Sequence, residues 1–355
     1  MIIEVEKADL SNVIASADVP AALEDGQARI RIDAFALTSN NITYAVFGDA
    51  MRYWDFFPVW GDESAGQGQI PVWGIGEVVE SLSEDCGVGE RLYGFFPMAS
   101  ELVITTGRAD ERGLTDIAAH RAPMAGAYNR YVRCERDPIY RADRERHQML
   151  LYPLFFTSFL VDDFVADDFE AQQLIVSSAS SKTAIGVAFM ARRRGCRVIG
   201  ITSARNKEFV ESLEIYDKVV CYDKVADLER LPSVFIDIAG NRDVLHAVHA
   251  RMDGVLAYSM AVGGTHWDHK VEVRDDLAKP APVFFFAPAQ ISKRSKEWGA
   301  GELAVRIAGA WDEYASWADG WIDFRAVTGP AAVIGAYLEL LRGSLDPKLG
   351  CIASL

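Results

Sequence analysis

The chain has 355 residues, half of them hydrophobic, and its formal net charge is −15 at neutral pH. A chain of this length can bury a sizeable core, most readily in two domains. Its negative charge makes nucleic acids and anionic membranes poor partners.

Nothing in the sequence predicts export or membrane insertion. Residues Met1–Lys7 lack the basic start of a signal peptide, and we find no run of the roughly 20 apolar residues that a membrane span needs. The five cysteines are odd in number and scattered, which is typical of reduced cytosolic thiols. We therefore expect a soluble protein of the cytoplasm.

Residues 1 to about 155 read as β-strands joined by short turns. Ala28–Ala34 alternates polar and apolar residues, as a half-buried strand does. Ile70–Glu80 is a strand interrupted by glycines, which often mark a close approach of two backbones. Val88–Phe96 supplies a turn and another strand. This pattern predicts a β-rich first domain.

An arginine- and tyrosine-rich segment, residues 108–152, follows these strands. In an acidic chain it would suit an anionic substrate or cap a cleft. The alternative, which we favour, is a solvated helical pair, because Glu135, Asp137, Asp143 and Glu145 interleave with the arginines.

The clearest motif is a strand–turn–helix–strand unit at 173–201. Leu174–Val176 has strand character, the next residues are small or polar, and apolar residues then recur at helical spacing. Cys196–Ile201 is the second strand. In such a βαβ unit a dinucleotide pyrophosphate lies on the helix N-terminus.

The turn departs from the glycine-rich pattern, since Ser178, Ser181 and Ala184 stand where glycines are expected. Small residues still allow close approach of a phosphate, and Ser178, Ser181, Lys182 and Thr183 are the candidate phosphate-binding residues. The alternative is a turn of the same shape that no longer binds a nucleotide.

The remaining strands complete a parallel sheet. Val234–Gly240 ends in Asp-x-x-Gly, Val255–Met260 leads to Gly263, and Ser295–Trp317 reads as one long helix. The sequence thus predicts an α/β protein. Residues 156–318 form a Rossmann-type doubly wound domain, and 1–155 form the β-rich domain, which 319–355 complete.

The order of these elements resembles the medium-chain dehydrogenase/reductase superfamily. The resemblance rests on N-x-x-T-Y-x-x-x-G at Asn40–Gly48, on V-G-E-R-L-Y-G at Val88–Gly94 and on the Asp237–Gly240 strand end, and it covers most of the chain. It is greatest to the zinc-free quinone and enoyl reductases and, more narrowly, to a branch known as a domain of unknown function. The resemblance implies a GroES-like first domain and no catalytic zinc.

The resemblance also implies site residues. Tyr44 would lie near the nicotinamide and the substrate carbonyl, where a phenol can stabilise a developing enolate, and Asn40 and Asn41 would help orient it. The alternative is a half-buried tyrosine that only packs. Lys207 and Tyr222 match positions that grip the 2′-phosphate of NADPH, and Gly263 is a further candidate for cofactor binding.

The residues after the second strand also favour NADPH over NADH. No acidic residue follows Thr202 until Glu208, whereas Ser203, Arg205 and Asn206 can bind a 2′-phosphate. An acidic residue at this position would instead favour the ribose 2′-hydroxyl of NAD.

Other chemistry has less support. His246-x-x-His249 and His266-x-x-His269 lack cysteines at ligand spacing, so we expect no metal, and no nucleophile elbow is present. The acidic run 161–169 reads as a solvated helix face. We therefore predict an NADPH-dependent reductase of a small enone, quinone or other activated carbonyl. Assembly of the protein as a homodimer stays open. A redox-inert relative binding a ligand or partner in the interdomain cleft, or a non-redox lyase, stays open.

Overall fold

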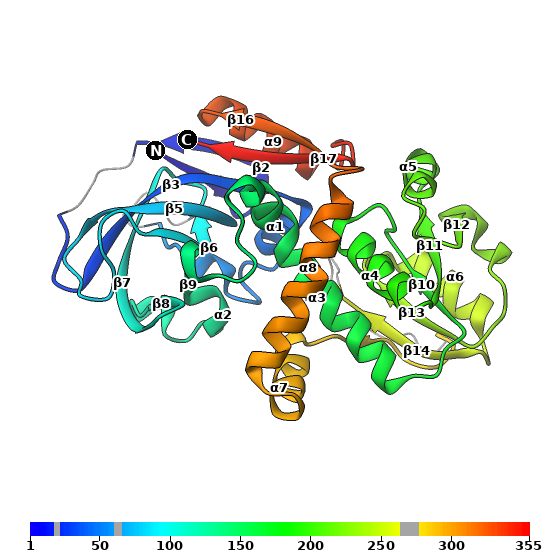
Figure 1. Ribbon diagram of the computed structural model, residues 1–355. Coiled ribbons are helices and arrows are strands. Elements are labelled where there is room, and N and C mark those ends of the chain that lie inside the picture. The colour runs from blue at the N-terminus through cyan, green and yellow to red at the C-terminus, as the bar shows by residue number, and fades with distance from the viewer. Residues whose placement is uncertain (18–21, 60–65, 263–276) are drawn as a thin grey trace. The chain divides into compact units, whose positions relative to one another are not determined.

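The chain forms two folding units, and the sequence of the second is inserted within that of the first (Figure 1). This computed structural model describes residues 1–17, 22–59, 66–262 and 277–355. Unit 1 comprises Met1–Leu150 and Ile322–Leu355, and unit 2 is Leu151–Trp321. Helix α3 (Glu145–Asp168) begins in unit 1 and continues into unit 2.

Unit 1 is built on an antiparallel sheet that closes on itself. Strand β3 pairs with β5 on one side and with β7 on the other, and β6, β9 and β8 complete the ring. The ring strands are β3 (Gln27–Leu37), β5 (Pro71–Ser81), β6 (Arg91–Pro97), β7 (Glu101–Asp110), β8 (Gly113–Asp116) and β9 (Arg130–Arg133). Apolar side chains such as Ile30, Phe35 and Phe96 fill its core.

Unit 1 also contains a second, three-stranded sheet and short helices. Strand β17 pairs antiparallel with β3 and parallel with β16, so residues that follow unit 2 in sequence extend the sheet of unit 1. The remaining elements of unit 1 are β1 (Ile2–Glu6), β2 (Asp9–Ser16), α1 (Ser39–Val46), β4 (Gln67–Gly68), α2 (Gly126–Asn129), β16 (Asp323–Thr328), α9 (Pro330–Leu341) and β17 (Leu349–Ser354).

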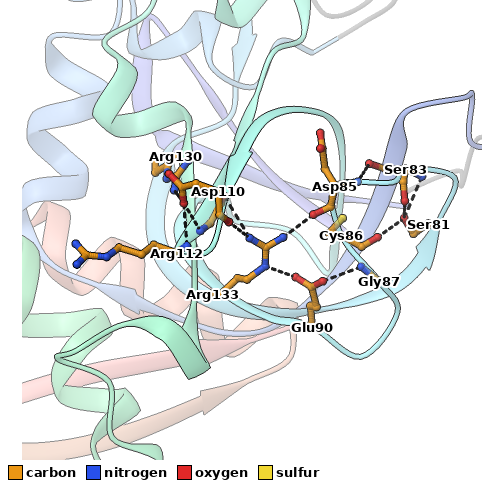
Figure 2. Close-up of polar contacts among 11 residues, drawn as sticks. Ser81, Ser83, Asp85, Cys86, Gly87, Glu90, Asp110, Arg112, Arg130 and Arg133 are labelled. Carbon is orange, nitrogen blue, oxygen red and sulfur yellow. Dashed lines mark hydrogen bonds and ion pairs between the residues drawn. The ribbon is translucent and has the colours of Figure 1, made fainter.

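The arginine-rich segment is not the helical pair that we favoured. Up to residue 144 it forms β8, α2, β9 and short turns, and only 145–152 are helical, as the start of α3. Two of its arginines bind other parts of the fold. Arg133 donates to Glu90 Oε2 at 2.7 Å and to the carbonyl oxygens of Asp85 and Asp110 (Figure 2). Arg121 is fully buried and donates to Asp116 Oδ2 at 3.1 Å. Local pairing was predicted, but the backbone is extended because the segment adds strands to the ring.

Unit 2 contains a parallel sheet in the order β12-β11-β10-β13-β14-β15. The predicted βαβ unit is confirmed as β10, α4 and β11. The elements are β10 (Gln173–Val176), α4 (Lys182–Arg193), β11 (Arg197–Thr202), α5 (Lys207–Ser212), β12 (Lys218–Cys221), β13 (Ser233–Asp237), α6 (Arg242–Met252), β14 (Leu256–Ala261), β15 (Val283–Phe284), α7 (Ala287–Glu297) and α8 (Ala300–Ala318). The α/β fold class is therefore confirmed.

A glycine of α4 sets how closely α3 and α4 pack. A Cβ atom on Gly186 would lie 2.5 Å from Ser158 Oγ, so a larger residue would push the helices apart. Ser158 donates to the carbonyl oxygen of Thr183 at 2.8 Å. This contact fixes the first turn of α4, where phosphate binding was predicted.

Two predicted helices differ from those observed. The long helix expected at 295–317 is divided into α7 and α8 at Gly299, whose φ of 88° no helical residue adopts. The helix α3 includes most of the acidic run 161–169, which was expected to be a solvated helix face. Its Asp162 is buried, whereas Asp167 and Asp168 are exposed. The acidic-face prediction is thus wrong for Asp162, because that residue points into unit 2 and pairs with Arg194 at 2.9 Å.

Residues 142–168 are also long and apolar enough to cross a membrane by length and composition. Our expectation that no segment meets that criterion is therefore wrong. Of the most apolar window, 56% is buried inside the fold. That burial is the behaviour of a core helix, in which apolar residues contact protein.

Candidate functional site

The turn between β10 and α4 has a defined shape without its expected glycines. Ser178 adopts a φ of 51°, a left-handed conformation that glycine adopts more readily. Ser181 caps α4, and its hydroxyl oxygen accepts from the backbone N–H of Ala184 at 3.2 Å. The first N–H groups of an α-helix have no partner within the helix, so Lys182 and Thr183 begin a turn suited to an anion.

A buried pair anchors this turn to the sheet. Ser177, directly after β10, donates to Asp237 Oδ1 at 2.6 Å, and its oxygen accepts from the N–H groups of Ile238 and Ala239. Asp237 also accepts from Gly240 N at 3.2 Å. Burial raises the pKa of Asp237, against the hydrogen bonds, which lower it. The Asp-x-x-Gly strand end thus holds the turn in place.

The residues after β11 lie beside the same turn. Asn206 Nδ2 donates to Ser180 Oγ at 2.9 Å and so links the two connections. Ser203 precedes the short 3-10 helix Ala204–Asn206, which contains Arg205. Lys207 begins α5 and forms an ion pair with Glu211 of the same helix. A nucleotide phosphate would therefore compete with Glu211 for the Lys207 ammonium.

Tyr222 also meets the turn. Its hydroxyl accepts from the backbone and the side chain of Ser178, and these bonds lower its pKa less than burial raises it. The structure thus gathers most of the predicted cofactor residues at the carboxyl edge of β10, β11 and β12. Gly263 lies outside the described residues.

The donor set at this edge fits a dinucleotide with an additional phosphate. Hydroxyl, amide and cationic groups at this edge come from Ser181, Lys182, Arg205 and Asn206. Of the acidic residues, Asp237 is engaged by Ser177 and Gly240, and Glu208 and Glu211 belong to the following helix. Two features fit a nucleotide poorly. One is the Cβ of Ser178, which stands where a glycine would leave the backbone open, and the other is the ion pair of Lys207 with Glu211.

In unit 1, Tyr44 is a buried phenol held by two donors. It lies on α1, is 4% exposed, and its oxygen accepts from Trp73 Nε1 at 3.2 Å. Burial raises the pKa of Tyr44 well above its ordinary value, and hydrogen bonds from Trp73 and Asn40 lower it by less. The phenol therefore keeps its proton at neutral pH. With its oxygen occupied by two donors, it can donate that proton to an acceptor.

Asn41 is used differently from the prediction. Its Oδ1 accepts from the backbone N–H of Thr38 at 2.7 Å, and its Nδ2 donates to Pro71 O at 2.9 Å. These bonds cap α1 and attach it to β5. Asn41 therefore positions the helix that carries Tyr44, and Asn40 is the neighbour that contacts the phenol.

Aromatic rings surround Tyr44 within unit 1. The ring centroids of Tyr53 and Phe95 lie 4.6 Å and 5.3 Å from that of Tyr44, and Tyr128 lies at 6.3 Å. Trp73 and Tyr128 are only half-buried. Sequence reasoning missed Trp73, because it is 29 residues from Tyr44 and no motif links the two.

Of the histidine candidates, His249 has structural partners. His249 is buried, and its Nδ1 and Nε2 lie 2.6 Å from Ala278 O and 2.9 Å from Ser259 Oγ. Burial lowers the pKa of His249. His266 and His269 lie outside the described residues. Within the described ranges, no group of three or more His, Cys, Asp or Glu side chains could hold a metal ion.

Comparison with known proteins begins with a family model. Residues 35–346 match the family described as "Protein of unknown function (DUF2855)". The chain belongs to that family. None of the curated proteins matches it.

Solved structures share the fold of this DUF2855 chain over nearly its whole length. CurA from Vibrio vulnificus in complex with NADPH is 14% identical with a TM-score of 0.63, and 99% of this chain and 98% of that one are covered. The yhdH oxidoreductase from Salmonella enterica in complex with NADP is 14% identical, with a TM-score of 0.55 and coverage of 100% and 99%. The CurK enoyl reductase is 12% identical, with a TM-score of 0.57 and coverage of 99% and 98%. The predicted resemblance to medium-chain reductases is thus confirmed for the fold.

Proposed function

We propose that this protein is an NADPH-dependent, zinc-free reductase of a small activated carbonyl compound, an enone or a quinone, acting in the cytoplasm. The observation that carries the proposal is the cationic, donor-rich carboxyl edge of the unit 2 sheet. There, Ser181, Lys182, Arg205 and Asn206 follow two adjacent parallel strands. Solved structures of the same fold in complex with NADPH or NADP support it.

The residues of unit 2 would bind and orient the cofactor. The first turn of α4, with Ser181, Lys182 and Thr183, would hold the pyrophosphate through N–H groups, hydroxyls and an ammonium. Ser203, Arg205, Asn206 and Lys207 would hold the 2′-phosphate. NADPH, when bound, supplies the hydride.

Tyr44 of unit 1 would donate a hydrogen bond to the substrate oxygen as negative charge develops on it. Trp73 and Asn40 fix the orientation of the phenol in advance, so little reorganisation is needed at the moment of reaction. Removal of one such donor costs roughly 100- to 1000-fold in kcat in enzymes that rely on it.

Two observations favour a second function. Ser178 holds a left-handed backbone with a side chain, and Lys207 already has an acidic partner in Glu211. A relative that has lost nucleotide binding and binds another ligand would tolerate both features. Nucleotide affinity separates the two functions.

The deciding experiment titrates the purified protein with NADPH and NADH by fluorescence. We expect NADPH to bind at least about tenfold more tightly, because one charge-assisted contact to the 2′-phosphate contributes roughly 1.5–3 kcal/mol. Arg205→Ala should reduce that preference and leave NADH affinity nearly unchanged, while Arg192→Ala, at the far end of α4, serves as the control. If neither nucleotide binds at millimolar concentration, the reductase proposal fails.

A second measurement tests Tyr44. Tyr44→Phe should lower kcat about 100-fold or more with unchanged NADPH affinity. Tyr53→Phe is the matched control, because Tyr53 is also a buried phenol of the aromatic cluster and its hydroxyl lies 3.5 Å from that of Tyr128. Equal losses in both variants would assign Tyr44 to packing alone.

A further inference from the structure

Unit 2 contains a pocket that the proposed function does not use. It has a volume of about 680 Å³ and is lined by residues of α3, α4, α8 and the segment before α8. Phe159, Met190 and Ala310 form apolar walls, one from each helix. This volume lies within the range of roughly 300–1000 Å³ in which proteins bind small molecules.

The pocket is separate from the predicted nucleotide residues. Met190 and Arg194 lie at the C-terminal end of α4, whereas Lys182 and Thr183 begin it. At 1.5 Å per residue, at least about 10 Å of helix separates the two places. A ligand in this pocket would therefore not occupy the phosphate-binding turn.

The pocket is lined by three arginines, Arg193, Arg194 and Arg306, and by two aspartates. One oxygen of each carboxylate is occupied, since Asp162 Oδ1 accepts from Arg194 Nε at 2.9 Å and Asp163 Oδ2 accepts from Arg294 Nε at 2.7 Å. Arg194 uses only its Nε in the described part of the chain, which leaves both terminal Nη atoms able to donate. Arg306 likewise donates from Nε to Glu302 at 2.8 Å.

Arg306 also lies over the pocket residue Trp298, with its guanidinium carbon 4.1 Å from the ring centroid. Stacking on an aromatic ring orients a guanidinium group but uses none of its N–H groups. The two arginines thus present oriented donors beside apolar walls. Such a combination suits a molecule with an anionic head and an apolar body.

A glycine keeps part of the pocket open. Gly309 lines it from the interior of α8, and a Cβ atom there would meet no atom within 4 Å. Glycine inside a helix is less favourable than alanine, and no neighbouring atom requires it here. The space at Gly309 is therefore available to a ligand.

From these observations we infer that the pocket between α3, α4 and α8 is a binding site for a small amphipathic organic anion. The ligand class is a linear aliphatic carboxylate, whose head would contact Arg194 and Arg306 and whose chain would lie along Phe159, Met190 and Ala310.

The test is isothermal titration calorimetry of the full chain with octanoate and decanoate, with decyltrimethylammonium as the cationic comparison. Each added CH₂ should tighten binding up to about fourfold, and the cation should bind at least about tenfold more weakly than decanoate. NADPH should leave decanoate binding unchanged, because the two places are separate.

Two variants locate the site. Gly309→Leu fills the pocket and should abolish decanoate binding, whereas Gly301→Leu, also on α8 with open space around its Cβ but outside the pocket, should not. Arg306→Gln should weaken binding about tenfold or more. The inference is overturned if decanoate fails to bind at millimolar concentration, if Gly309→Leu binds it as the wild type does, if the cation binds equally well, or if NADPH displaces it. Failure of nucleotide binding would leave these outcomes unaffected.

Discussion

Because of Asp162, the free energy of unfolding should fall as the pH rises. An ordinary salt-bridged carboxylate makes it rise instead. Burial raises its pKa from 3.8 to about 6, although the ion pair with Arg194 lowers it. The folded state therefore binds this proton more tightly than the unfolded chain does. The contribution of Asp162 to the free energy of unfolding is fully present below the pKa that this residue has in the unfolded chain. It is lost as the pH rises through about 6.

The size of the effect follows from the shift. A shift of about two units corresponds to roughly 3 kcal/mol. In Asp162→Asn the titrating group is absent, so the wild type should lose roughly 3 kcal/mol of unfolding free energy relative to the variant between about pH 4 and pH 7.

Urea unfolding at several pH values, followed by tryptophan fluorescence, measures this difference. Asp167→Asn is the control on the same helix. The pKa of Asp167 is lowered, chiefly by its hydrogen bond from Lys293. The wild type should therefore gain unfolding free energy relative to Asp167→Asn as the pH rises. A wild type that gains stability over Asp162→Asn as the pH rises would show that the Arg194 ion pair dominates and would refute the reasoning.

Two further predictions concern the unfolding free energy of single variants. Ser178→Gly should be more stable than Ser178→Ala by about 1 kcal/mol in denaturant unfolding, because both lose the hydroxyl and only alanine keeps the left-handed strain; the reverse order would contradict this. Arg133→Ala should cost about 3 kcal/mol, since it removes a charge-assisted bond to Glu90 and leaves carbonyl oxygens without a donor. Arg130→Ala, at a more exposed ion pair, should cost about 1 kcal/mol or less, and equal losses would assign both arginines to the surface.

The sequence predicted those elements that depend on residues close together in the chain. The apolar run at Leu174–Val176, the small residues after it and the helical spacing from Ile185 are enough to specify a βαβ unit. The end of β11 likewise could be read as donor-rich from its own residues. These features depend on neighbours in sequence, so they needed no knowledge of the tertiary structure.

The features that sequence reasoning missed depend on residues far apart in the chain. Charge alternation around Arg121 and Arg133 indicated solvated helices. Arg121 is instead buried beside Asp116 of β8, and Arg133 binds Glu90 in the turn before β6. Asp162 looked like its exposed neighbours Asp167 and Asp168, and only the position of Arg194 distinguishes it. The partner of Tyr44, Trp73, could not be found for the same reason.

The insertion of unit 2 into unit 1 has a consequence for biosynthesis. On the ribosome, all of Leu151–Trp321 is made before β16 and β17 exist, so unit 2 has its complete sequence while unit 1 still lacks two strands. Until β17 arrives, the edge of β3 at Phe35–Leu37 has no strand of its own chain to pair with. An unpaired strand edge is a template for other chains. The nascent protein would therefore be most prone to aggregation late in translation, after unit 2 has been synthesised.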